Sequence, residues 1–103
     1  MSIVQNKEEI FQQLVKHSGE IRSFGVKSLG LFGSFLIADK IHPQSDIDFL
    51  VEFHAEKKTY NNFFDLSIYL EGLLNRKVEL VTKESLSKYI GPHILKQVAN
   101  VAI

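Results

Sequence analysis

The sequence predicts a single domain of the α/β (α+β) class, and three observations lead to that prediction. The chain has 103 residues, 45 % of them hydrophobic, which suits one domain with a substantial core. Apolar residues recur at helical spacing in two segments, 7–18 and 60–74. Short apolar runs typical of strands occupy 26–32, 45–53 and 77–82. We therefore expect strands and helices to alternate within one domain, residues 1–103.

Composition argues against several classes of protein. Lys and Arg number 12, as do Asp and Glu, so the basic excess of a dedicated nucleic-acid-binding protein is missing. The absence of cysteine excludes disulfides and thiolate metal sites. No apolar run approaches the roughly 20 residues of a membrane span, and the first residues lack the layout of a signal peptide. We expect a cytoplasmic protein whose partners are neither membranes nor nucleic acid.

The first helix is predicted to begin at a capping box. Asn6 is the expected N-cap and Glu9 stands three residues later. Gly19 is the expected C-terminal stop. We expect this helix to pack against the core and to carry no catalytic or binding residues.

A strand over 26–32 leads directly into Gly33-Ser34, and residues 35–38 could form a short helix. Glycine lets a ligand approach the backbone closely. The Ser34 hydroxyl can cap the helix, whose first amides would point outward as donors to an anion. A plain turn is the alternative interpretation of the same residues.

The stretch 45–53 carries two carboxylates, Asp46 and Asp48, at the start of the most apolar strand. Side chains at i and i+2 of a strand share a face, so the two carboxylates should lie close together. Four apolar residues should face the other way: Ile47, Phe49, Val51 and Phe53. Two like charges this close raise each other's pKa unless a cation or hydrogen-bond donors offset them.

The segment 60–74 predicts a helix whose apolar stripe is broader than one sheet contact requires. Either the helix is deeply buried, which we expect, or part of it meets a partner. Its apolar residues are Phe63, Phe64, Leu66, Ile68, Tyr69, Leu70 and Leu73. A last helix is predicted to begin at Pro92. The apolar residues 101–103 either fold back on the core or serve in assembly, so a homo- or hetero-oligomer stays open.

The third strand, 77–82, alternates its side chains. Val78 and Leu80 should share one face, and Lys77, Glu79 and Val81 the other. If this strand lies beside 45–53, Glu79 joins the two aspartates; otherwise it is a solvated charge. Carboxylates from separate strands suit Mg²⁺, which water and substrate phosphates commonly complete. Together with free amides at Gly33-Ser34, they favour phosphoryl or nucleotidyl transfer.

Gly33-Ser34, a spacer, and Ser45-Asp46-Ile47-Asp48 before an apolar strand resemble the signature of the DNA polymerase β nucleotidyltransferase superfamily. The small size and the segment 78–82 resemble its minimal nucleotidyltransferases (MNT). The resemblance implies a small mixed β-sheet flanked by helices. It also implies that Gly33, Ser34 and Ser45 bind the nucleotide, and that Asp46, Asp48 and Glu79 are catalytic and hold Mg²⁺. ATP would be the substrate, and an all-helical HEPN ribonuclease toxin the partner.

Three features depart from the family pattern. The third carboxylate is usually Asp, and Glu79 is one methylene longer. An Arg-Gly often follows the Gly-Ser, but this chain has no Arg between Ser34 and Asp46, where Lys40 is the available point charge in its place. The spacer is also slightly longer than usual.

Three functions stay open. The first is an antitoxin that transfers AMP from ATP to a tyrosine of its toxin. The second is an antitoxin of the same fold that neutralises its toxin by binding, with weak or no catalysis. The third is a nucleotidyltransferase of a small molecule, although the chain offers no room for a substrate domain.

Overall fold

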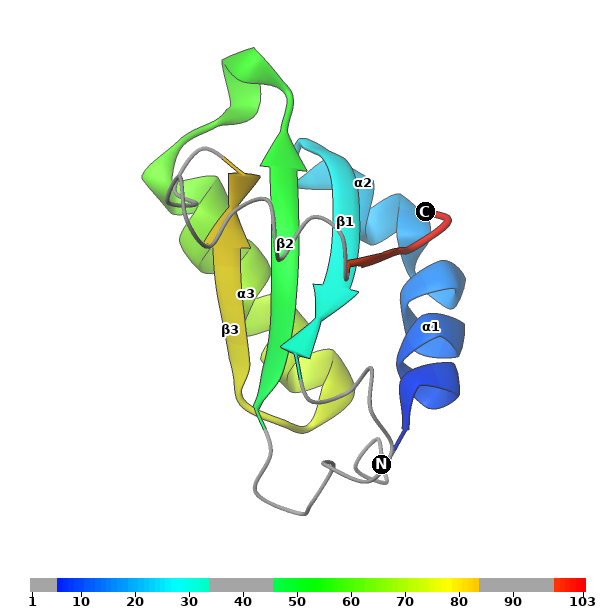
Figure 1. The fold of residues 1–103 in the computed structure, drawn as a ribbon. Helices are drawn as coiled ribbons and strands as arrows, with labels where there is room; N and C mark the ends of the chain where they lie inside the picture. Colours follow the sequence, from blue (N-terminus) through cyan, green and yellow to red (C-terminus); the bar gives the residue numbers. More distant parts are fainter. Residues whose placement is uncertain (1–5, 34–45, 84–97) are drawn as a thin grey trace.

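The computed structural model describes residues 6–33, 46–83 and 98–103. Several sequence predictions lie outside these residues: Ser34, the short helix 35–38, Lys40, Ser45 and the helix from Pro92. The described part holds one four-stranded sheet with strand order β3-β2-β1-β4 (Figure 1). Its strands are β1 (Val26–Phe32), β2 (Ile47–Phe53), β3 (Val78–Thr82) and β4 (Ala99–Asn100).

The sheet is mixed, as expected. β1 pairs with β2 and with β4 in antiparallel orientation, whereas β2 and β3 run parallel. Parallel neighbours need a crossover connection. A short 3₁₀ helix, η3 (Ala55–Lys57), and the long helix α3 (Tyr60–Leu74) provide it. The crossover brings the starts of β2 and β3 to the same end of the sheet.

The helices α1 (Lys7–Lys16), α2 (Ser18–Ser23) and α3 cover one face of the sheet (Figure 1). Ile47, Phe49 and Val51 of β2 are fully buried on that face, as the alternation predicts. They join one core cluster with Ile10 and Leu14 of α1, Ile21 of α2, Leu29 and Leu31 of β1, and Leu66, Leu70 and Leu74 of α3. The opposite face of β2 therefore presents Asp48 and Glu52.

The prediction that the first helix runs to a stop at Gly19 is wrong. α1 ends at Lys16, and α2 begins at Ser18 and includes Gly19. The break falls at His17, whose amide still bonds to the carbonyl of Gln13 while its own carbonyl accepts from Ile21. The chain turns from α2 into β1 at Gly25, whose φ is +89°. The Asn6 cap is confirmed, since its Oδ1 accepts the Glu9 amide at 2.9 Å.

Helix α3 agrees with its predicted bounds, and Thr59 caps it through the Asn62 amide at 3.2 Å. Its wide apolar stripe divides into two parts. Leu66, Leu70 and Leu74 are fully buried. Three other large side chains face outward: Tyr60, Phe64 and Ile68, which are 76 %, 49 % and 54 % exposed. Deep burial of the whole stripe, the expectation from sequence, is therefore wrong for this face.

The sequence prediction missed β4. Ala99 and Asn100 pair with Leu31 and Gly30 of β1, and the Val101 amide donates to the Leu29 carbonyl at 2.9 Å. Val101 is buried, so the apolar residues 101–103 fold back on the core. A search of the described residues found no helix long and apolar enough to cross a membrane.

Candidate active site

The site is built on one row of the sheet. Asp48 of β2 is the register partner of Phe32 on β1 and of Glu79 on β3. Register partners on neighbouring strands project to the same face. The sequence predicts that Glu79 joins the two aspartates if its strand lies beside 45–53. The two strands are adjacent, and the backbone of Glu79 lies next to that of Asp48. This row lies on the sheet face opposite the helices.

Gly33 closes the site from the end of β1. Its φ is +81°, a conformation that side chains with a Cβ rarely adopt. A Cβ placed there would stand 2.2 Å from Oδ2 of Asp48 and 3.0 Å from its Cγ. The backbone of Gly33 is thus pressed against the carboxylate, and only glycine permits this approach.

Burial and neighbouring acids perturb the Asp48 carboxyl group strongly. Burial first, and then the charges of Glu79 and Asp46 and a hydrogen bond with Glu79, raise the pKa of Asp48 from 3.8 to about 6. A hydrogen bond between two carboxyl groups requires a proton on one of them, so the pair shares a proton below that pH. Among the described residues, no basic side chain forms an ion pair with Asp46, Asp48 or Glu79, so this part of the chain does not offset the negative charge of the row near neutral pH.

The carboxylate oxygens of this row are ligands of the kind that Mg²⁺ prefers. Mg²⁺ is commonly bound by one or two carboxylates and completed by water and phosphate. Asp48 and Glu79 supply such a pair, while Asp46 acts on Asp48 through its charge. Within residues 6–33, 46–83 and 98–103, no three His, Cys, Asp or Glu side chains are grouped closely enough to hold a metal. The structure therefore assembles two carboxylates, and the third would have to turn toward them.

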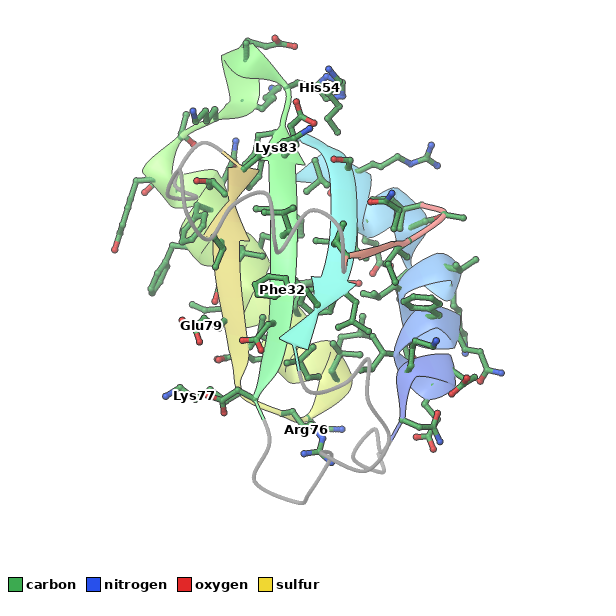
Figure 2. All side chains as sticks on the ribbon, in the orientation of Figure 1. Phe32, His54, Arg76, Lys77, Glu79 and Lys83 are labelled. Carbon is green, nitrogen blue, oxygen red and sulfur yellow. The ribbon has the colours of Figure 1, made fainter. Side chains whose placement is uncertain are left out.

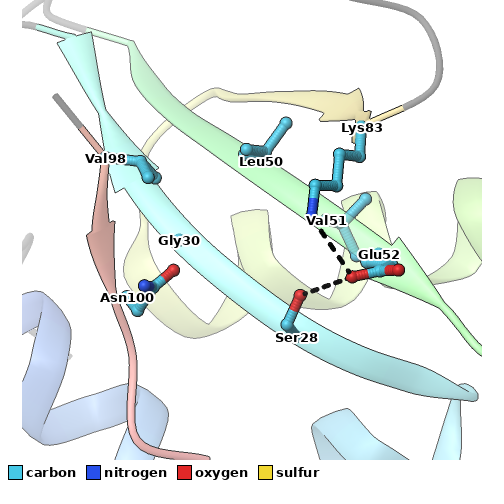
Figure 3. A pocket seen from close by; sticks show the side chains of 8 residues that line it. All are labelled: Ser28, Gly30, Leu50, Val51, Glu52, Lys83, Val98 and Asn100. Carbon is cyan, nitrogen blue, oxygen red and sulfur yellow. Dashed lines mark hydrogen bonds and ion pairs between the residues drawn. The ribbon is translucent and has the colours of Figure 1, made fainter. Parts of the chain in front are cut away.

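Glu52 provides an instructive contrast on the same face. Its carboxylate lies 3.9 Å from Nζ of Lys27. Figure 3 shows its two other contacts, with Nζ of Lys83 at 3.9 Å and with Ser28 Oγ, which donates to it at 3.4 Å. Glu52 borders a cavity of about 190 Å³ that Leu50, Gly30 and Asn100 also line. Because two cations offset its charge, Glu52 behaves as a structural carboxylate. Asp48, near the start of the same strand, has no such cation among the described residues.

Sequence reasoning missed two residues beside the row. The sequence predicts Phe32 only as the end of an apolar strand, yet Phe32 is the direct neighbour of Asp48 and is only partly buried. The sequence also predicts Lys77 on the face of Glu79, but indicates no role for it. Only the register between β1, β2 and β3 shows that Phe32 and Lys77 lie beside this row, and the sequence does not contain that register.

The chain belongs to the nucleotidyltransferase domain family, whose model matches residues 7–102. It is 40 % identical over 95 residues to the protein adenylyltransferase MntA of Thermococcus cleftensis. That match spans 91 % of this chain and 94 % of the relative.

Two solved toxin–antitoxin structures share the fold. One, determined with AMP-PNP, superposes with a TM-score of 0.66 at 22 % identity, covering 87 % of this chain and 70 % of the matched chain. The other is a tri-AMPylated HEPN toxin of Shewanella oneidensis in complex with its MNT antitoxin. It superposes with a TM-score of 0.63 at 20 % identity, covering 90 % and 69 % of the two chains.

Proposed function

We propose that this chain is an antitoxin that transfers AMP from ATP to a tyrosine of a HEPN-type toxin. The observation that carries the proposal is the hydrogen-bonded pair of Asp48 and Glu79, which no cation of the described residues offsets. The Asp48 carboxylate of this pair lies against the backbone of Gly33. The similarity to an MntA adenylyltransferase supports protein as the acceptor and AMP as the transferred group. The toxin complexes of the same fold support a HEPN partner.

In the proposed reaction the tyrosine oxygen forms a bond to the α-phosphorus of ATP. The bond from that phosphorus to the oxygen bridging to the β-phosphorus breaks, and pyrophosphate leaves. Glu79, the most exposed acid of the row, would accept the phenol proton. Asp46, Asp48 and Glu79 are the residues that would hold Mg²⁺, which neutralises phosphate charge when bound. Gly33 would let the triphosphate approach, with Ser34 and Ser45 as further nucleotide-binding residues.

The test is transfer to a purified HEPN toxin. The protein, its toxin, ATP and Mg²⁺ are incubated, and the toxin is weighed by intact mass spectrometry. We expect AMP adducts that disappear with Asp48→Asn and remain with Glu52→Gln, which changes a carboxylate outside the row. A stable complex that never yields an adduct would contradict the proposal.

A second function has its own supporting observation. Tyr60, Phe64 and Ile68 form an exposed apolar stripe on α3, and the rings of Tyr60 and Phe64 stack with centroids 6.0 Å apart. Such a surface suits an antitoxin that neutralises by contact alone. Growth rescue by the double variant Asp46→Asn/Asp48→Asn separates the two functions. Full rescue favours neutralisation by contact, and loss of rescue with the complex intact favours catalysis.

A further inference from the structure

Within the described residues the candidate site has an excess of negative charge. Glu79 and Asp46 both act on Asp48 through their charges, and none of the three forms an ion pair with a described basic residue. A nucleoside triphosphate adds roughly four negative charges, and bound Mg²⁺ cancels only part of the total. A site of this kind therefore needs a cation from the protein within reach of the phosphates.

Lys77 lies at the end of the sheet where Asp46, Asp48 and Glu79 are found. Its carbonyl accepts the Ile47 amide at 3.0 Å, so it lies beside the start of β2, level with Asp46. Because Val78 pairs with Ile47 and Glu79 with Asp48, alternation places the Lys77 side chain on the face of Glu79. Figure 2 shows Lys77 and Glu79 following each other along the outer edge of β3. Lys77 is exposed and forms no ion pair within the described residues.

The other basic residues on or near the sheet are placed differently. Lys27 and Lys83 both lie within ion-pair distance of Glu52. Lys57 and Lys58 follow the far end of β2. Arg76, the neighbour of Lys77, is only 8 % exposed and already has an interaction partner. Among the described residues this leaves Lys77 as the cation on the open face at the carboxylate end.

We propose that Lys77 is a nucleotide-binding residue that contacts the phosphate chain at this site. The inference rests on the proposed nucleotidyltransferase function and adds Lys77 to the residues that would bind the nucleotide. A lysine ammonium is a point charge on a flexible stem, so it can follow the phosphates without a fixed bidentate geometry. Its contribution should scale with ligand charge: large for a triphosphate and small for a monophosphate.

Calorimetric binding of ATP and of AMP, both with Mg²⁺, tests this role. We expect Lys77→Ala to weaken ATP binding about tenfold or more and AMP binding about threefold or less. Lys77→Arg, which keeps the charge, should bind ATP within about threefold of the wild type. Lys27→Ala removes the same charge from the far end of β1 and should leave both affinities unchanged. Matching thermal unfolding of all variants establishes that the fold is intact.

Two results overturn the inference, and they differ from each other. If the wild type binds ATP and Lys77→Ala binds it equally well, Lys77 has no phosphate role while the proposed function stands. If the wild type binds no ATP with Mg²⁺, the proposed function fails and the role of Lys77 fails with it. An equal loss in Lys77→Ala and Lys27→Ala would also overturn the inference, because it would indicate only a general effect of net charge.

Discussion

The backbone of Gly33 touches the carboxylate of Asp48 so closely that a methyl group on Gly33 would stand 2.2 Å from Oδ2. Gly33 directly follows β1, and Asp48 lies in the neighbouring antiparallel strand β2, where it is the register partner of Phe32. The turn at the end of β1 and the acid at the start of β2 therefore form one unit.

We predict that Gly33→Ala strongly impairs the site. The substitution places a Cβ on a residue at φ +81° and displaces the Asp48 carboxylate. We expect nucleotide binding to weaken at least tenfold and the free energy of unfolding to fall by about 1–2 kcal/mol. Calorimetric ATP titration and urea unfolding measure the two effects.

Gly72→Ala is the matched control for that experiment. Gly72 lies inside α3, and a Cβ there meets no atom within 4 Å. Alanine should stabilise the helix by about 0.5–1 kcal/mol and leave nucleotide binding unchanged. Equal behaviour of the two alanine variants would refute the close contact between Gly33 and Asp48.

Asp48 should make stability depend on pH. Its ordinary pKa, that of the unfolded chain, is 3.8, and in the folded chain the pKa is about 6. Between these values the unfolded state has lost the proton that the folded state still holds, so the free energy of unfolding falls as pH rises. We predict that Asp48→Asn is more stable than the wild type above pH 6, by about 1 kcal/mol after allowance for solvent screening. The advantage should vanish below about pH 4.

Urea unfolding of both proteins at a series of pH values, without divalent cations, measures this difference. Mg²⁺ at neutral pH should then raise the stability of the wild type more than that of Asp48→Asn, because a cation offsets the ionised row. A difference between the two proteins that stays constant from about pH 4 to 8 would mean that the Asp48 pKa is ordinary.

Glu79 should be one source of the raised pKa of Asp48, and burial the larger one. We predict that Glu79→Gln lowers the pKa of Asp48 below 6 but not to 3.8, because burial persists. Carboxyl ¹³C chemical shifts followed through a pH titration report this directly. Glu52→Gln should leave the Asp48 titration unchanged, since Lys27 and Lys83 already offset Glu52.

Helix α3 should respond oppositely on its two faces. Leu70 is fully buried in the core, whereas Ile68 is 54 % exposed. We predict that Leu70→Ala costs about 2–5 kcal/mol of unfolding free energy, and Ile68→Ala less than about 0.5 kcal/mol. Chemical denaturation measures both. A large loss from Ile68→Ala in the isolated chain would show that the stripe packs internally and is not an exposed surface.

Most of the fold could be predicted from periodicity. The bounds of β1 and α3 agree with the sequence prediction. Each element has a regular apolar pattern, and residues that favour a start or an end stand at its limits, such as the N-cap Thr59 of α3. The break at His17 could not be predicted, because it depends on how α2 packs Ile21 into the core. The sequence does not predict β4, because a strand of two residues is too short to show alternation of apolar and polar side chains. Its two residues form a strand only through their pairing with β1.

The candidate site was only partly predictable. Alternation placed Asp46 and Asp48 on one face, but the partner of Asp48 depended on strand order, which no local pattern contains. The contact between Gly33 and Asp48, and the position of Lys77 beside the start of β2, follow from tertiary register. The functional roles of all six predicted site residues stay predictions: Gly33, Ser34, Ser45, Asp46, Asp48 and Glu79.

The crossover through α3 also has a consequence for synthesis of the protein. A nascent chain that has emerged only to Phe53 contains Gly33 and Asp48 but only the β1–β2 hairpin of the sheet. A two-stranded hairpin is marginally stable at best. Glu79 arrives after α3, so the acidic pair exists only once the parallel strand has docked. Ribosome-bound fragments ending before β3 should therefore bind no nucleotide, and acquisition of binding would mark completion of the fold.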